Sequence, residues 1–259
     1  MESFELVAIM AAKKAGLLLK SRLGRKRKVT YKGAVNLVTE MDLFSEKVIV
    51  SEIRQRYPTH SFLAEEKTST QEKSLYRWII DPLDGTTNYT HGYPIFCVSL
   101  ALEKEGEVVL GVVYDPMRDE LFLAKKGKGA RLNGRKIHVS STPKLAQSLL
   151  ATGFPYDLRD SPVNNFDHFR NFALRVHAVR RAGSAALDLC YVAAGRFDGF
   201  WEMKLAPWDM AAGNLIVTEA GGKATDFLGR RLALEGKQVL ASNGKIHPEM
   251  IRVLKLGRS

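Results

Sequence analysis

The apolar pattern of this chain changes its period twice, and that change limits the folds that the chain can adopt. Apolar residues recur at helical spacing in residues 4–18 and 43–57, until Pro58 stops the second run. From about Trp78 the spacing becomes extended, and from Pro143 onward strand-like and helix-like segments alternate. We therefore expect two opening helices, an antiparallel sheet and then a mixed α/β part. The helices expected in this last part are residues 162–175, 183–195, 207–222 and a final helix near the C-terminus.

These patterns divide the chain into two halves. With 259 residues, of which 45% are hydrophobic and 26% charged, the chain can bury a large core and is too apolar to be disordered. We predict one compact unit with an N-terminal α+β half, residues 1–145, that carries the antiparallel sheet. A C-terminal mixed α/β half, residues 146–259, would pack against it as further layers, with a cleft between the halves.

The chain is strongly basic, with 39 Lys and Arg against 28 Asp and Glu and a formal net charge of +11. Such a balance favours an anionic partner, which includes nucleic acid, a membrane surface and a negatively charged substrate. Much of the excess lies in residues 20–32, which contain no acid and seven cations: Lys20, Arg22, Arg25, Lys26, Arg27, Lys28 and Lys32. Two interpretations stay open for this segment: a solvated loop between the first two helices, or a cationic surface that attracts phosphate groups.

Several features favour a cytoplasmic protein without a membrane segment. The N-terminal stretch has acids before its apolar residues and lysines among them, which is the wrong order for a signal peptide. No apolar run approaches the roughly 18 residues that a membrane span needs. Cys97 and Cys190 both lie in apolar runs, so we expect two buried free thiols. The six histidines have no metal-ligand spacing, and we expect them in loops or at the surface.

Acidic residues follow apolar segments at three places in the chain. Asp81 and Asp84 end the run that begins at Trp78, Glu65 follows another apolar run, and Asp209 opens an expected helix. Each acid taken alone could be a helix cap or a turn residue. Asp81 and Asp84 differ, because two carboxylates so close together resist joint ionisation unless a cation compensates them. A set of oxygen ligands suits Mg²⁺ or Ca²⁺ rather than zinc.

The motifs of several other enzyme classes are absent. The acids do not have the spacing of an EF-hand, and the chain contains no GxxxxGK[ST] phosphate loop and no GxSxG nucleophile elbow. It also lacks the D-x-D motif of phosphatases that form an acyl phosphate. The chemistry is therefore expected to rely on carboxylates and metal ions rather than on a protein nucleophile.

Four strings, in this order and spacing, resemble the inositol monophosphatase family of Mg²⁺-dependent, lithium-sensitive phosphatases. They are NLVTEMD (36–42), FLAEE (62–66), WIIDPLDGTTNY (78–89) and PWDMAAGNLIVTEAGG (207–222). The likeness covers nearly the whole chain. It implies a layered αβαβα sandwich of the sugar-phosphatase type, a homodimer and two to three Mg²⁺ ions in each active site.

The resemblance also implies a role for each matching residue. The metal ligands would be Glu65, Asp81, Asp84, Asp209 and the backbone carbonyl of Leu83. Asp81 would bridge two ions, and a third, weaker ion would lie near Glu65. Asp42 and Thr86, with Glu65 as a further catalytic residue, would position and deprotonate the attacking water. Paired metal ions stabilise both the entering and the leaving oxygen of an in-line displacement, so no protein nucleophile is needed.

Substrate contacts follow from the same resemblance. The phosphate would bind backbone N–H groups at an expected helix start, and Glu202 matches the acid that accepts hydrogen bonds from inositol hydroxyls in the family. The substrate-binding residues that the resemblance implies are Asp84, Gly85, Thr86, Gly183, Ser184, Ala185, Glu202 and Asp209.

Two hypotheses of different classes result. The first is Mg²⁺-dependent hydrolysis of myo-inositol 1-phosphate and related monophosphates, with fructose 1,6-bisphosphate or another small phosphate ester as an alternative substrate of the same site. The second is an additional binding role, because some bacterial members of this family also act as accessory factors bound to the transcription machinery and ribosomal RNA. The basic residues 20–32 would suit contacts with a phosphate backbone. The set of acids ranks hydrolysis first.

Overall fold

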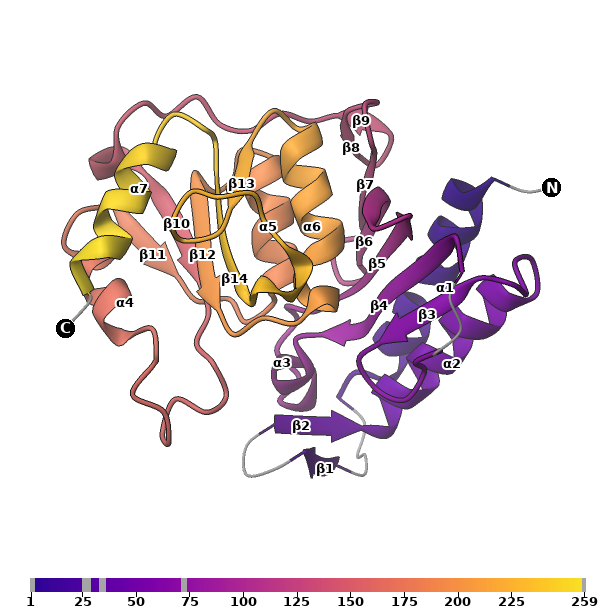
Figure 1. Ribbon diagram of the computed structural model, residues 1–259. Coiled ribbons are helices and arrows are strands. Elements are labelled where there is room, and N and C mark those ends of the chain that lie inside the picture. The colour runs from indigo at the N-terminus through magenta and orange to yellow at the C-terminus, as the bar shows by residue number, and fades with distance from the viewer. Residues whose placement is uncertain (1–2, 25–28, 33–35, 71–73, 258–259) are drawn as a thin grey trace.

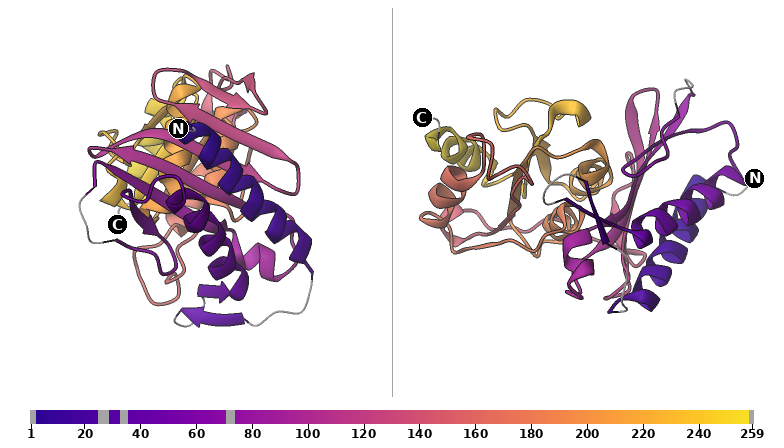
Figure 2. Two further views of the ribbon diagram at one scale, coloured as in Figure 1. Left: turned by 90° about the vertical axis from the view of Figure 1, so that its right-hand side faces the viewer. Right: turned by 90° about the horizontal axis from the view of Figure 1, so that it is seen from below.

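The chain folds into five layers in the order helix, sheet, helix, sheet, helix (Figures 1 and 2). This is a computed structural model that describes residues 3–24, 29–32, 36–70 and 74–257. The αβαβα sandwich expected from the sequence is confirmed. Within those ranges, no helix combines the length and the apolar character that crossing a membrane requires.

The first two layers come from the N-terminal half. Helices α1 (Phe4–Arg22) and α2 (Glu40–Arg54) pack side by side over one face of a seven-stranded sheet. Its strands lie in chain order and, apart from the parallel pair β3–β4, are antiparallel. They are β3 (Ser61–Ala64), β4 (Tyr76–Asp84), β5 (Cys97–Lys104), β6 (Glu107–Asp115), β7 (Glu120–Lys125), β8 (Ala130–Leu132) and β9 (Arg135–Lys136). The antiparallel sheet is thus confirmed for this half.

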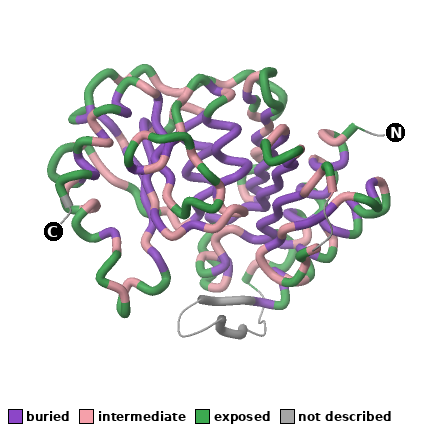
Figure 3. Tube along the Cα trace, in the orientation of Figure 1, coloured by how far each residue is buried: buried purple, intermediate pink, exposed green. Residues whose placement is uncertain are grey.

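The central layer consists of two helices that lie between the sheets. Helix α5 (Ala185–Ala193) begins after Ser184, whose Oγ accepts the Leu187 N–H at 3.3 Å, and α6 (Pro207–Glu219) begins at a proline. Both helices contact strands of both sheets, and every residue of α5 is buried (Figure 3). A helix buried on all sides must be apolar all round, which the α5 sequence is except at one position.

The C-terminal half supplies the last two layers. Its five-stranded mixed sheet has the order β11, β10, β12, β14, β13, and the short helices α4 (Phe166–Ala173) and α7 (His247–Leu254) lie at its outer side (Figure 1). The strands are β10 (Leu149–Thr152), β11 (Ala178–Arg180), β12 (Gly199–Met203), β13 (Lys223–Thr225) and β14 (Gln238–Ser242). Single 3₁₀ turns are η1 (Leu145–Gln147), η2 (Leu234–Gly236) and η3 (Lys255–Gly257). The division at residue 145 stays a prediction.

The expected helices are present, but their bounds differ; α5 and α6, for example, are shorter than the expected 183–195 and 207–222. Two further differences have an identifiable cause. The second helix begins at Glu40 rather than near residue 43, because Thr39 and Asp42 form a capping box at its start. The helix expected at 162–175 covers only 166–173. The Asn165 side chain donates to Thr152 Oγ1 and accepts the Trp201 indole N–H, both at 2.8 Å. These bonds hold the backbone that precedes α4 in a non-helical conformation.

The basic segment 20–32 is not the single loop that was expected. Lys20 and Arg22 belong to the last turn of α1, and Lys32 ends the short strand β1 (Val29–Lys32), which pairs with β2 (Asn36–Thr39). Residues 25–28, which hold four of its seven cations, lie outside the described residues. The proposed phosphate-attracting role of this segment therefore stays a prediction.

The cysteines and one histidine complete the comparison. Cys97 and Cys190 are buried free thiols, as expected. The expectation for histidines is wrong for His247, which is fully buried. Its two ring nitrogens lie 2.9 Å from Thr225 Oγ1 and 2.8 Å from Ser242 Oγ, which ties α7 to the neighbouring strands.

Candidate active site

The site is built around the end of β4, where the strand becomes irregular. The pairing with β5 shifts register between Asp81 and Asp84, and Asp81 Oδ1 accepts the Leu83 N–H at 3.0 Å, which curls the backbone around Pro82. Gly85 then takes a φ of +97° and leads into α3 (Thr86–Thr90). A Cβ at Gly85 would lie 2.9 Å from the Ile95 carbonyl oxygen, so this turn requires glycine.

Four acids from three separate parts of the chain act on one another electrostatically. Burial raises the pKa of Asp81 well above its usual value, and the charges of Glu65, Asp84 and Asp209 raise it further. Asp209 opens α6, and burial, followed by the charge of Asp84, raises its pKa to about 8. Asp84 has its pKa raised by burial as well. The structure therefore brings together the acids that the sequence predicted.

Each of the three aspartates is anchored by a backbone N–H. Asp81 accepts from Leu83 at 3.0 Å, Asp84 Oδ2 from Ala186 at 2.8 Å, and Asp209 Oδ2 from Ala206 at 2.6 Å. Such bonds fix the direction in which each carboxylate points.

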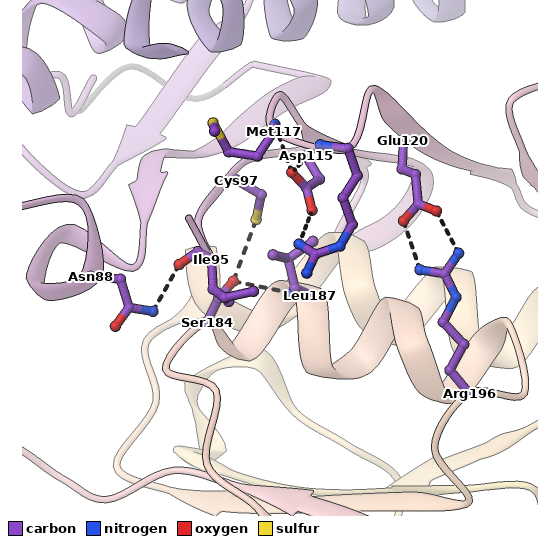
Figure 4. A network of polar contacts seen from close by, with 10 residues as sticks. Asn88, Ile95, Cys97, Asp115, Met117, Glu120, Ser184, Leu187 and Arg196 are labelled. Atoms are coloured by element: carbon purple, nitrogen blue, oxygen red, sulfur yellow. Dashed lines mark hydrogen bonds and ion pairs between the residues drawn. The ribbon is translucent and has the colours of Figure 1, made fainter. Parts of the chain in front are cut away.

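Asp84 also links the two halves of the chain. Besides the Ala186 N–H, its Oδ2 accepts the Ser184 hydroxyl at 2.6 Å, so a carboxylate from β4 holds the first turn of α5. The Cys97 thiol lies 3.6 Å from Ser184 Oγ (Figure 4). At the other end of α5, Arg196 binds Glu120 of β7 through both oxygens (Figure 4).

A second polar chain connects α2 to the same turn. The Thr86 hydroxyl lies 2.8 Å from Asp42 Oδ1 and 3.0 Å from the Leu83 carbonyl oxygen. The other carboxylate oxygen of Asp42 accepts the N–H and the hydroxyl of Thr39, at 2.7 and 2.6 Å. Burial raises the pKa of Asp42 from its usual value, although these hydrogen bonds oppose the rise. Asp42 thus serves as a helix-capping group and as the partner of Thr86.

A cavity of about 120 Å³ lies beside these groups and receives residues from both halves. Its lining includes seven of the predicted site residues: Asp84, Gly85, Gly183, Ser184, Ala185, Glu202 and Asp209. Burial raises the pKa of Glu202 to about 8, and the charge of Arg181 opposes this rise. Thr86 does not line the cavity but lies next to Gly85 in the chain.

Sequence reasoning missed several residues of the same cavity. Gly153, Tyr156, Arg181 and Asp188 also line it. A Cβ at Gly153 would lie 2.1 Å from Glu202 Oε1, so the missing side chain leaves room for this carboxylate. Burial and the charges of the acids together raise the pKa of Tyr156. The one available signal was Asp188, an acid in an otherwise apolar helix.

The donor chemistry of the site fits a hard divalent cation. Carboxylates, a backbone carbonyl and a hydroxyl supply only oxygen. Burial, and after it the negative charge of neighbouring acids, raises the pKa values of Asp81 and Asp209, and a cation would compensate that charge. Over the described ranges, no three His, Cys, Asp or Glu side chains already stand as a finished ligand cluster. The fit therefore rests on the type of donor and on the charge of the site.

Comparisons with known proteins agree with this geometry. The inositol monophosphatase family model matches residues 1–256. The inositol-1-monophosphatase of Synechocystis sp. is 46% identical, over 96% of this chain and 87% of its own. The Nus factor SuhB of Pseudomonas aeruginosa is 44% identical, over 96% of this chain and 94% of its own.

Solved structures give the same result. The inositol monophosphatase of Anabaena (Nostoc) sp. superposes with a TM-score of 0.90 at 45% identity, covering 98% of this chain and 95% of that one. The family match and the similarity of fold cover both halves of the molecule, and both halves contribute acids to the site. The chain therefore belongs to the inositol monophosphatase family and is a hydrolase of phosphate monoesters.

Proposed function

We propose that the protein hydrolyses myo-inositol 1-phosphate, and related inositol monophosphates, with Mg²⁺ as its cofactor. The observation that carries this proposal is the composition of the cavity: acids of the metal-binding type, Asp84 and Asp209, and a separate buried carboxylate, Glu202, line the same space. The phosphate end of the substrate needs acids that hold metal ions, and the polyol end needs a carboxylate that accepts hydrogen bonds from hydroxyl groups. The match of relatives named inositol-1-monophosphatase supports the same substrate.

The residues that would hold two to three Mg²⁺ ions are Glu65, Asp81, Asp84, Asp209 and the Leu83 carbonyl. Bound Mg²⁺ would lower the pKa of a water molecule and neutralise charge on the phosphate. The anchoring N–H groups on Asp81, Asp84 and Asp209 keep these side chains in place before any ion arrives. Preformed ligands reduce the ordering cost of binding.

The chain itself orients and deprotonates the attacking water. Because the Thr86 hydroxyl donates its hydrogen to Asp42 at 2.8 Å, its oxygen is left to accept a hydrogen from water. The water oxygen then forms a bond to phosphorus while the bond from phosphorus to the ester oxygen breaks, and this oxygen takes up a proton from solvent water and leaves as the alcohol. The proton released by the water passes through Thr86 to Asp42.

The two ends of the substrate would be held by different elements. The N–H groups of Gly85 and Thr86 lie at the start of α3, where the first backbone donors of a helix have no partner inside the helix, and they would bind phosphate oxygens. Residues 183–185, Asp209 and Glu202 would bind the alcohol. Fructose 1,6-bisphosphate and other small phosphate esters remain alternative substrates of this site.

A phosphate-release assay tests the proposal. The unaltered protein should hydrolyse inositol 1-phosphate only with Mg²⁺, should be inhibited by millimolar lithium, and should prefer this substrate to fructose 1,6-bisphosphate. Asp81→Asn and Asp209→Asn should abolish turnover, whereas Asp167→Asn, on the exposed face of α4, should not change it. Full activity of either site variant would overturn the proposal.

A role in transcription is a second candidate, favoured by the relatives named Nus factor SuhB and by the seven cations of residues 20–32. Replacing Arg25, Lys26, Arg27 and Lys28 by glutamine should abolish salt-dependent RNA retention and leave phosphatase turnover unchanged. Retention that survives this change would rule out the segment as the binding surface. A homodimer and a cytoplasmic location complete the proposal.

A further inference from the structure

Asp188 is an anomaly in the central layer. It is the one charged residue of α5, a helix buried along its whole length, and only 1% of its surface is exposed. Its Oδ1 atom is buried and has no hydrogen-bond partner among the residues that the structure describes. Buried polar atoms without partners destabilise a fold and are rare in proteins, so this one requires an explanation.

The position of Asp188 on α5 directs it to the cavity. Residues four apart in a helix lie on the same face, and Asp188 is four residues after Ser184, whose hydroxyl binds Asp84. Both residues line the cavity together with Glu202 and Arg181. Asp188 therefore lies one helical turn after Ser184, on the face of α5 that lines the cavity.

Asp188 lines the same cavity as Glu202, the acid that the proposed function assigns to the polyol. After burial, which dominates, the charge of Glu202 is the largest factor that raises the pKa of Asp188, ahead of that of Asp84. The charge of Arg181 lowers it. Asp188 and Glu202 thus face one cavity from two different elements, α5 and β12.

Favourable interaction with the helix dipole does not explain this burial. An acid in the first turn of α5 gains from the positive end of the helix. An acid on a solvent-exposed helix start is stabilised by the dipole in the same way and keeps its hydration, so the dipole gives no reason to bury Asp188. The unpartnered oxygen in a polar cavity instead indicates that its hydrogen-bond partner is a group of a ligand, which binds and dissociates.

We propose that Asp188 is a specificity-determining residue that binds a hydroxyl group of the substrate alcohol through its unpartnered oxygen, beside a second hydroxyl held by Glu202. This rests on the proposed function, since it requires a polyol phosphate as substrate. Two acids on separate elements would select an alcohol with at least two hydroxyl groups. An alcohol without them would leave Asp188 buried and unpaired, which disfavours its binding.

The test compares two phosphate esters of the same ring size. Inositol 1-phosphate carries hydroxyls on its ring and cyclohexyl phosphate carries none. Asp188→Leu should lower kcat/KM for inositol 1-phosphate by about 10- to 100-fold, mainly through KM, as expected for a lost hydrogen bond to a buried group. Turnover of cyclohexyl phosphate should change less than about twofold. Asp188→Asn, which keeps an amide oxygen, should recover part of the loss.

A matched control and a stability measurement separate this role from a structural one. Cys190→Ala changes an equally buried residue of α5 that does not line the cavity, and it should leave the ratio of the two substrates unchanged. Because Asp188→Leu removes an unpartnered buried acid, its urea midpoint should be equal to or higher than that of the unaltered protein.

The outcomes distinguish the two proposals. Equal losses for both esters, or no loss for inositol 1-phosphate, would overturn the role of Asp188 while leaving the proposed function intact. If Asp188→Leu does not fold, an unchanged substrate ratio in Asp188→Asn has the same meaning. An unaltered protein that does not hydrolyse inositol 1-phosphate would overturn both proposals.

Discussion

Replacing Glu46 should weaken metal binding, although Glu46 is not an expected ligand. This residue of α2 is 3% exposed, and its carboxylate accepts four donors from the turn that follows β3. They are the N–H groups of Glu66 (3.0 Å), Lys67 (3.1 Å) and Thr68 (2.9 Å) and the hydroxyl of Thr68 (2.8 Å). The turn is therefore wrapped around one carboxylate, and Glu65, an expected ligand, precedes it directly.

The size of the effect follows from these contacts. Hydrogen bonds to a charged group contribute about 1.5–3 kcal/mol each when measured singly, but water can replace part of them in a half-buried turn, so we expect Glu46→Ala to cost about 2–4 kcal/mol of stability. Groups that orient metal ligands typically change metal affinity by about 10- to 100-fold. The half-saturating Mg²⁺ concentration should rise by a factor in this range, and Glu46→Gln should fall between the two proteins.

Urea unfolding in chelator and Mg²⁺ titration of phosphate release measure the two effects separately. Glu52→Gln is the matched control, because Glu52 lies on the same helix and pairs with Lys14 and Arg56. It should lower stability slightly and leave the Mg²⁺ dependence unchanged. A Glu46→Ala protein that loses stability but keeps its half-saturating Mg²⁺ concentration would refute the reasoning, since Glu46 would then support only the fold.

Three further predictions concern other residues. Burial lowers the pKa of His247 from 6.5 to about 4. As the pH falls, the unfolded chain therefore takes up a proton on His247 before the folded protein does, which favours unfolding. The free energy of unfolding should fall by up to about 3 kcal/mol from pH 6.5 to pH 4. Urea unfolding across this range should lose that slope in His247→Gln; an unchanged slope would assign it elsewhere. Gly153→Ala should displace the Glu202 carboxylate and raise KM for inositol 1-phosphate about tenfold with little effect on thermal stability; an unchanged KM would contradict the placement of Glu202 in the substrate site. Gly85→Ala should lower stability by about 1–3 kcal/mol in thermal unfolding, because it strains a φ of +97°; a neutral substitution would show that the turn can relax.

The layers of the fold could be predicted because each has its own apolar period. The run that becomes β4 is extended and ends at acids, whereas α5 and α6 are mostly apolar on all sides, as helices between two sheets must be. The start of α2 was placed too late because its capping residues, Thr39 and Asp42, are polar and fall outside the apolar pattern.

The missing parts of the site depend on contacts between distant segments. Glu46 is one of several acids on α2, and nothing local distinguishes it except that it continues the buried stripe of Asp42, Ser45 and Ile49. Its partners lie 20 to 22 positions further along the chain, so only the folded structure identifies them. Gly153 gave no signal either, because the carboxylate that occupies its missing side-chain space belongs to another strand.

The bond network of Asp84 has a consequence for interpreting loss-of-function variants. The same carboxylate holds the first turn of α5 through Ser184 and Ala186 and is needed for catalysis in the proposed mechanism. A substitution at this position would remove chemistry and loosen the joint between the two halves at once. Inactivity of such a variant, taken alone, would be weak evidence for metal binding, whereas inactivity of an Asp81 variant, which bonds within its own turn, would be more informative. Genetic screens that sample both positions should therefore weigh them differently.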